Sequence, residues 1–296
     1  MNKKVFSINP VLVREMKVKM RTWKAPLLIC FYDMVLILLV ITLMNMGVVD
    51  SLGRISEESI VTVYLFMIAI QCTLIALIAP ALTAGCISGE REKQTLDILL
   101  STTMKHGSIV VGKLFASLSQ MILLIVSSLP IFSIVFLYGS IGAREIMELF
   151  IYYIITAVLM GSIGVFFSTF TQRSTVATVM SYIFILFICF GTILISMAYV
   201  RILLMPQGNK FGPYEHNYWL MYFSPAAGWG SLMSAQLGEG VTNRIYGLYL
   251  NGKHTGILLW HINAMLDMLI SALLLWLSAL RINPARTRLF QLKSRK

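Results

Sequence analysis

The chain has 296 residues, of which 57% are hydrophobic and 12% charged, and its mean hydropathy is +0.79. A soluble domain is about 45–50% apolar and about 25% charged, so this chain has too few charges for a water-facing surface of its size. The composition excludes a disordered, collagen-like or disulfide-stapled chain. The net charge of +11 does not predict a nucleic-acid partner, because Lys and Arg lie in short segments between long apolar runs.

Six apolar stretches are long enough to cross a membrane. A helical span needs about 20 apolar residues. Six runs reach that length: about 27–49, 60–84, 109–138, 146–170, 175–200 and 256–280. Backbone polar groups in hydrocarbon must pair within their own segment, which favours helices, and the runs are too continuous for barrel strands. The sequence therefore predicts one all-α transmembrane domain over 1–296, with six spans.

The distribution of basic residues predicts the orientation of these spans. Eighteen Lys and Arg residues fall in or beside 1–26, 85–108, the connection at Arg173 and 281–296, whereas the opposite side has six. Cytoplasmic connections of membrane proteins are enriched in Lys and Arg. We expect a multi-pass protein of the inner or plasma membrane with both termini in the cytoplasm.

The N-terminal segment 1–26 contains a stretch, 9–24, that alternates apolar and basic positions. This pattern is typical of an amphipathic helix lying along the inner leaflet, where lipid headgroups attract the basic side chains. Two interpretations stay open. The helix is either a membrane-surface anchor or an elbow helix that also touches a cytoplasmic partner.

The cytoplasmic loop 85–108 combines charges with an apolar stripe. Glu90 and Glu92 favour the positive N-terminal end of a helix, and Leu96, Leu99 and Leu100 follow at helical spacing. We expect a short charged helix with one apolar face, held at the membrane surface by the two flanking spans. The alternative is a solvated linker whose leucines touch lipid.

The segment 201–255 is expected on the extracytoplasmic side. It is rich in aromatic residues, and a short apolar helix is predicted from Ser224-Pro225 to Gly238. That helix is too short to span, so it lies in the outer interface or dips into the membrane and returns. An aromatic belt explains most of the pattern. The functional alternative is an outer gate built from Trp219, Pro225 and Trp229.

Acidic and amide side chains inside the spans are candidates for a translocation path. Asp in the middle of a membrane is costly, about 2.5–3.5 kcal/mol on insertion scales, so it usually has a function or a partner. We expect Asp267 to face a polar path, and an alternative is structural hydrogen bonding within the bundle. The candidate path residues are Asp267, Asn263, Gln71, Gln120 and Asp33.

Catalytic and metal-binding motifs are not predicted. Residues 107–113 match the start of a phosphate-binding loop, but Leu114 stands where Ser or Thr should hold Mg²⁺, and the match opens an apolar span. The histidines do not form a ligand cluster. We therefore expect no catalytic residue, no metal site and no enzyme activity on this chain.

The string GEREKQTLDILLST at 89–102, followed by IVVGK at 109–113, resembles the permease subunits of type-2 ATP-binding-cassette exporters. That family shows a GERE-x-GTL-x-LL-x-TP pattern after the second span. Two positions depart from it: Gln94 replaces the usual Gly, and Thr103 the usual Pro. The elbow, six spans and short helix before the last span also look like the family.

The resemblance implies a transport role driven by another protein. It implies that the loop forms a coupling helix against a separate cytoplasmic ATPase, which would hold the ATP and Mg cofactors. A second permease chain, identical or related, is also implied, with lipid around both. The coupling residues carried over are Glu90, Arg91, Glu92, Lys93, Thr95, Leu96, Leu99 and Leu100. An ion-coupled secondary transporter or channel, and a membrane sensor or scaffold, remain as alternatives; the cargo is not predicted.

Overall fold

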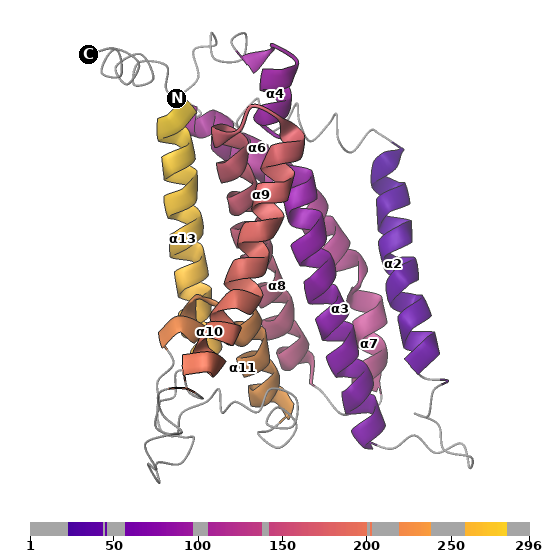
Figure 1. The fold of residues 1–296 in the computed structure, drawn as a ribbon. Helices are drawn as coiled ribbons and strands as arrows, with labels where there is room; N and C mark the ends of the chain where they lie inside the picture. Colours follow the sequence, from indigo (N-terminus) through magenta and orange to yellow (C-terminus); the bar gives the residue numbers. More distant parts are fainter. Residues whose placement is uncertain are drawn as a thin grey trace, which may run out of the picture.

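The computed structural model describes residues 23–43, 45, 57–96, 106–137, 142–199, 202, 219–237 and 258–282. Within these ranges every regular element is helical and no strand occurs. The long helices stand side by side with their axes roughly aligned (Figure 1). The predicted all-α membrane fold is confirmed. The predicted elbow segment 9–24 lies almost wholly outside the described residues, as do the tail after Ile282 and parts of the longer loops.

The first half of the chain forms most of the bundle. Its elements are α2 (Lys24–Leu43), α3 (Glu57–Thr83), α4 (Ser88–Glu92), α6 (His106–Ser127), α7 (Leu129–Leu137) and α8 (Ala143–Phe170). The second half supplies α9 (Ser174–Leu186), η2 (Phe187–Gly191), α10 (Thr192–Tyr199), η5 (Trp219–Phe223), α11 (Pro225–Leu237) and α13 (Leu259–Ile282).

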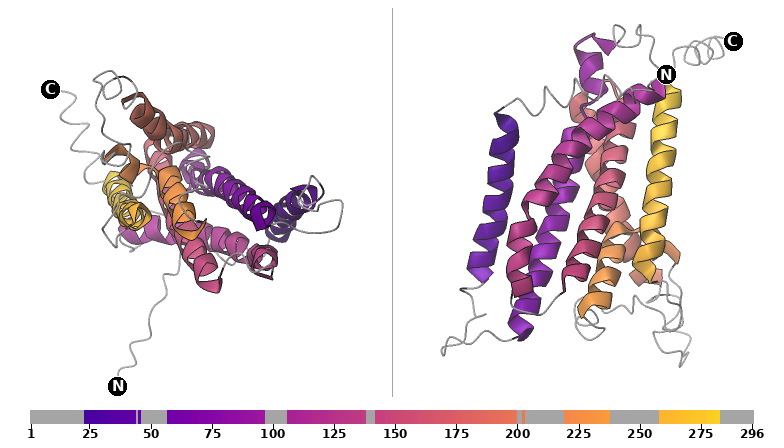
Figure 2. Two further views of the ribbon diagram at one scale, coloured as in Figure 1. Left: turned by 90° about the horizontal axis from the view of Figure 1, so that it is seen from below. Right: turned by 180° about the vertical axis from the view of Figure 1, so that it is seen from behind.

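Five described helical segments are long and apolar enough to cross a membrane. They are Val61–Glu92, Gly107–Ser133, Ala143–Phe170, Ser174–Ser196 and Leu259–Ile282. The first predicted span corresponds to an apolar helix that is shorter within the described residues, Pro26–Thr42. Figure 2 shows this helix, α2, at one edge of the bundle. The count of six spans stays a prediction.

The fourth span, α8, lies at the centre of the bundle. It packs against α3, α6, α9 and α13, and most of its residues are buried. Small residues permit this close packing: a Cβ on Gly164 would overlap the hydroxyl of Thr83 on α3, and one on Gly161 would lie 3.2 Å from Leu114 on α6. Small side chains let membrane helices approach closely. The central helix is therefore held by its neighbours on several sides.

Two spans consist of more than one helical segment. Helix α6 ends at Ser127 and α7 begins at Leu129, because Pro130 has no N–H to continue the ladder. The span of α9 and α10 contains a π-helical turn, η2, at its middle. The Cys189 carbonyl in that turn accepts a hydrogen bond from the Ser224 hydroxyl at 3.1 Å. The π-turn thus connects this span to the start of α11.

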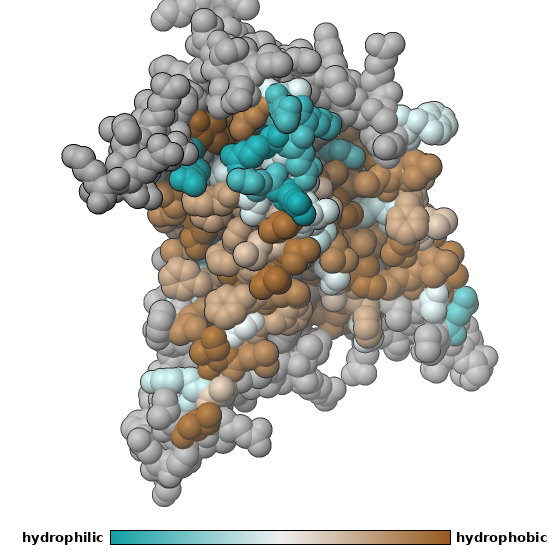
Figure 3. Space-filling view, turned by 45° about the horizontal axis from the view of Figure 1, so that its top comes forward, coloured by the Kyte–Doolittle hydropathy of each residue, from teal (hydrophilic) through white to brown (hydrophobic). Residues whose placement is uncertain are grey.

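The two ends of the bundle differ in character. One end carries α4, the first turns of α6 and α9, and the last turns of α8 and α13; α11 lies near the other end (Figures 1 and 2). Helix α6 crosses the bundle obliquely, from Gly107 beside Ala279 of α13 to Ser127 beside Asp33 of α2. A hydrophilic patch lies near the α4 end, above a hydrophobic belt (Figure 3). Exposed polar residues there include Glu92, Lys93, Gln94 and Arg173.

Candidate functional site

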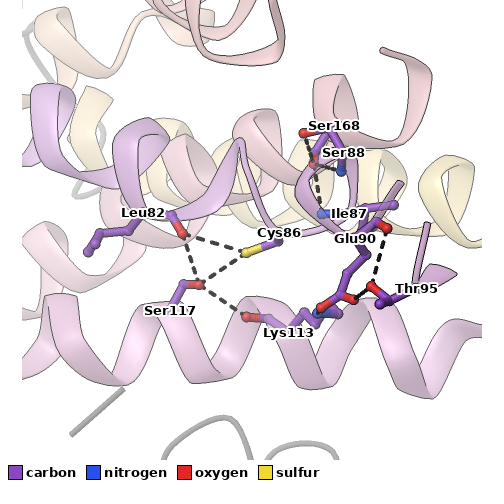
Figure 4. Close-up of polar contacts among 9 residues, drawn as sticks. All are labelled: Leu82, Cys86, Ile87, Ser88, Glu90, Thr95, Lys113, Ser117 and Ser168. Carbon is purple, nitrogen blue, oxygen red and sulfur yellow. Dashed lines mark hydrogen bonds and ion pairs between the residues drawn. The ribbon is translucent and has the colours of Figure 1, made fainter. Parts of the chain in front are cut away.

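Helix α4 begins against the centre of the bundle. The backbone N–H groups of Ile87 and Ser88 both donate to the hydroxyl oxygen of Ser168 on α8, each at 2.9 Å (Figure 4). The first N–H groups of a helix have no partner within that helix, so an outside acceptor is needed where they are buried. Ser88 is itself fully buried. Helix α8 therefore supplies the cap of α4.

Glu90 connects α4 to α6. Its carboxylate forms an ion pair with the Lys113 ammonium at 3.1 Å, and it also accepts a hydrogen bond from the Thr95 hydroxyl (Figure 4). The Lys113 side chain is only 4% exposed, whereas that of Glu90 is 30% exposed. Because a buried ammonium is costly without a partner, Glu90 stabilises the position of Lys113 in the bundle.

Arg91 connects α4 to the end of α8. Its guanidinium donates to the backbone carbonyls of Thr171 at 2.8 Å and Thr169 at 3.3 Å. The last carbonyls of a helix are unpaired and form the negative end of the helix dipole, so a cation is favourable there. The Arg91 side chain thus caps the C-terminal end of α8 from the neighbouring helix.

Glu92 connects α4 to the start of α9. Its carboxylate accepts hydrogen bonds from the backbone N–H and the hydroxyl of Ser174, each at 2.8 Å. Ser174 is the first residue of α9, so the acidic side chain lies at the positive end of that helix dipole. This contact lies at the exposed surface of the bundle end.

Three consecutive charged residues therefore hold three different helices. We call Glu90, Arg91 and Glu92, together with their partners Lys113, Thr169, Thr171 and Ser174, the α4 junction. That these residues contact a separate ATPase stays a prediction of the family resemblance. In the structure, the three side chains contact the chain's own helices, whereas Lys93 is exposed.

The predicted continuous helix from Glu90 to Leu100 is wrong. Helix α4 ends at Glu92, and the Thr95 N–H bonds to the Glu90 carbonyl while the Gln94 N–H bonds to the Arg91 carbonyl. This pair of bonds is a Schellman motif, which places the residue after the C-cap in the left-handed region. Gln94 has φ of 57°. The apolar stripe is therefore separated from the charged turn: Leu96 is helical again, and Leu99 and Leu100 lie outside the described residues.

Sequence reasoning missed most of the partners in the α4 junction. Ser174 stands beside an apolar run without any charge pattern to mark it, as does Ser168, which caps α4, and Lys113 counts among the basic residues that predict the orientation. A serine at the first or last turn of a span is the available clue, because helix ends carry unpaired backbone groups. Pairing these serines with a segment about 80 residues away in the sequence requires the fold.

The candidate path residues fall into two groups. Gln71 donates to the Ser128 hydroxyl at 3.2 Å, and the Ser127 hydroxyl donates to the Asp33 carboxylate at 3.0 Å, which joins α2, α3 and the α6–α7 break. Asn263 and Asp267 lie on α13. Among the described residues, no hydrogen bond joins Asp267 to either Gln71 or Gln120. The path from Asp267 to the glutamines stays a prediction.

The short helix α11 is buried in protein along most of its length. Nine of its 13 residues are buried. Its start lies beside Tyr152, whose hydroxyl is 3.2 Å from the Pro225 carbonyl, and the Gln236 amide near its end donates to the Glu145 carbonyl at 2.8 Å. Tyr152 lies about 13 Å along α8 from its first residue. Helix α11 therefore begins inside the bundle and runs outward, antiparallel to α8.

A polar contact fixes the start of α11. The Asn263 amide donates to the carbonyls of Tyr222 at 2.8 Å and Ser224 at 3.1 Å, and its oxygen accepts from the Tyr152 hydroxyl. A Cβ on Gly228 would overlap that hydroxyl and lie 2.6 Å from the Asn263 oxygen, so only glycine fits.

Two of the three candidate gate residues belong to this contact region. Pro225 begins α11 beside Tyr152, and Trp229 packs edge-on against the Tyr152 ring at 6.5 Å between centroids. Trp219 begins η5, but its side chain lies outside the described residues. The gate itself stays a prediction.

Comparison with known proteins identifies the family. A search of the curated proteins found no match. The model of the ABC-2 family transporter proteins matches residues 14–225, a range that includes the α4 junction and most of the spans. A match over more than half of the chain, together with an all-helical membrane fold, is sufficient for assignment. The chain belongs to the ABC-2 family of transporter proteins and is a membrane permease subunit.

Proposed function

We propose that this permease subunit forms the translocation path of an exporter and is moved by a separate cytoplasmic ATPase, which holds ATP and Mg. The α4 end of the bundle is the proposed contact with that ATPase. The family assignment supports the general role, and the α4 junction is the observation that carries the specific mechanism.

The α4 junction is suited to transmit movement. Helix α4 has five residues, and its charged side chains reach Lys113 in α6, the first residue of α9 and the C-terminal end of α8. Charge-assisted hydrogen bonds are shorter and stronger than neutral ones, so these helix ends move as one body with α4. A displacement applied to the exposed side of α4 therefore shifts three spans together.

Two sets of residues have different roles in this proposal. Arg91 and its neighbours in the α4 junction transmit movement inside the permease. Exposed Lys93, with Leu96 and the leucines after it, is proposed to contact the ATPase. This division predicts that removing Arg91 uncouples the complex without dissociating it, whereas reversing the charge of Lys93 weakens the association.

Charge asymmetry supports a cytoplasmic location for the α4 end. Among the described residues, Arg91, Lys93, Lys113, Arg173 and Arg281 lie toward this end, while Arg144 lies at the opposite end. Lys and Arg are concentrated on the cytoplasmic side of membrane proteins. We extend the proposal to two permease chains, identical or related, each contacting an ATPase subunit.

Purification from the native membrane tests the proposal. A tagged chain in mild detergent is expected to retain a subunit that hydrolyses ATP in a vanadate-sensitive manner, and Lys93→Glu is expected to lower its yield. Glu148→Gln, which changes a carboxylate at the opposite end, is the matched control and should leave the yield unchanged. A chain that carries no ATPase and transports cargo with an ion gradient alone would refute the proposal and support a secondary transporter.

A further inference from the structure

Asp267 is a buried acidic residue whose role the α4 junction does not explain. It lies in the interior of α13, eight residues after Leu259, and its side chain is fully buried. Neither carboxylate oxygen has a hydrogen-bond partner among the described residues. Buried polar groups in proteins are nearly always paired, and an ionisable residue inside a membrane is usually functional.

Aromatic residues lie beside the N-terminal half of α13. Tyr152 on α8 lies between two indoles: its ring centroid is 6.5 Å from that of Trp229 and 6.2 Å from that of Trp260. Both contacts are edge-to-face, with interplanar angles of 84°. Asn263, one turn before Asp267, binds the Tyr152 hydroxyl. The indole N–H groups of Trp229 and Trp260 are also buried, and no acceptor for them occurs in the part of the chain that the structure describes.

The chain offers Asp267 no counter-charge among its described residues. The described Lys and Arg residues lie toward the ends of helices, and the nearest to the interior, Lys113, pairs with Glu90. By contrast, Asp33 on α2 accepts a hydrogen bond from Ser127. Asp267 is therefore a candidate for a charge supplied from outside the chain.

We propose that Asp267 recognises a lipophilic organic cation as the transported cargo. A carboxylate provides the charge partner, and aromatic rings attract cations through their negative faces. Small-molecule sites in proteins combine an apolar and aromatic lining with a few polar groups, which is the composition found here. The described residues contain no group of three His, Cys, Asp or Glu that could hold a metal ion, which favours an organic cation over an inorganic one.

This inference rests on the proposed transport function and names its class of cargo. In the present arrangement α11 packs against both α8 and α13, and Asp267 is closed to solvent. Access to Asp267 therefore requires that α11 or a neighbouring helix move away. Such a movement would have to break the hydrogen bonds that Asn263 makes to the start of α11.

Two probes of equal size and opposite charge test the inference. Tetraphenylphosphonium is a lipophilic cation, and tetraphenylborate is its anionic counterpart. Equilibrium dialysis against the purified full-length permease is expected to show saturable, stronger binding of the cation. Asp267→Asn should weaken cation binding about tenfold, equivalent to about 1.4 kcal/mol, while Asp267→Glu should retain part of it. Glu148→Gln is the control carboxylate-to-amide change and should bind like the wild type.

Equal binding of the two probes by the wild type, or unchanged cation binding in a folded Asp267→Asn variant, would overturn the inference. A second measurement needs no variant. A hydrophobic carbodiimide modifies buried carboxyl groups, and peptide mass spectrometry would report the extent at Asp267. Protection by the cation but not by the anion is expected, and equal protection contradicts it. Neither assay involves ATP. A negative result in either one would therefore refute the proposed cargo without affecting the outcome of the ATPase purification.

Discussion

The carboxylate of Glu92 accepts both the backbone N–H and the hydroxyl of Ser174, so a residue of α4 provides the N-terminal cap of α9. The Arg173 N-cap residue forms no such side-chain bond of its own. One consequence is that the α8–α9 connection depends on α4 for its geometry. This contact gives Glu92 a structural role within the permease.

Glu92→Ala is expected to loosen the first turn of α9. The change removes the acceptor for the Ser174 N–H, so hydrogen exchange of the backbone amides from Ser174 to Ala177 should accelerate several-fold. Mass spectrometry of the peptide over these residues measures the effect. Lys93→Ala is the neighbouring control, and equal acceleration in that variant would contradict a specific cap by Glu92.

Gln94→Gly is expected to stabilise the protein. Gln94 has a φ of 57°, a conformation that costs a residue with a side chain roughly 1 kcal/mol relative to glycine. Part of this gain is offset by the greater freedom of glycine in the unfolded chain. The midpoint of thermal unfolding in detergent should rise for Gln94→Gly and stay unchanged for Gln94→Ala. A decrease with glycine would contradict the Schellman ending of α4.

Lys113→Met tests the ion pair between α4 and α6. Methionine fills a similar volume without charge, so the variant leaves Glu90 without its cation and should lose about 1–3 kcal/mol of stability. The double variant Lys113→Met with Glu90→Gln should lose less free energy of unfolding than the sum of the losses in the two single variants, because either change alone already breaks the ion pair. Denaturant titration in mixed micelles provides the free energies. Strict additivity would show that the two side chains do not interact.

Gly228→Ala should destabilise the packing of α11 against Tyr152 and Asn263. The added methyl group would overlap the Tyr152 hydroxyl and lie 2.6 Å from the Asn263 oxygen, which predicts a loss of about 1–3 kcal/mol. Gly107→Ala is the matched helical control, since its Cβ would meet Ala279 at an ordinary 3.8 Å. Thermal unfolding compares the two variants. If Gly228→Ala were as stable as Gly107→Ala, α11 would not pack as described.

Hydropathy predicted most of the helical framework. Long apolar runs identify helices because the backbone must satisfy its own hydrogen bonds in lipid. The Ser224-Pro225 start of the short helix is close to the observed start of α11 at Pro225. Hydropathy alone did not show the breaks in the third and fifth apolar runs. The first break coincides with Pro130, which the sequence shows, whereas the π-turn η2 depends on local backbone hydrogen bonding.

The loop 85–108 shows what the spacing of residues along the sequence cannot predict. Spacing alone predicted one helix with a leucine stripe, but the helix ends early because its last carbonyls bond to Gln94 and Thr95. The direction of Arg91 depends on the end of α8, which lies about 80 residues away in the sequence. For the same reason the packing of Tyr152 and Trp229 near the start of α13 could not be predicted from α13 alone.

The central claim is that the α4 junction transmits movement from an ATPase to the spans. Its most direct test is vanadate-sensitive ATP hydrolysis by the purified complex in lipid, compared between Arg91→Ala and Lys93→Ala. Our account predicts that Arg91→Ala keeps a normal amount of the ATPase subunit but loses most of the hydrolysis that depends on the permease. Wild-type hydrolysis in a folded Arg91→Ala complex would contradict the account.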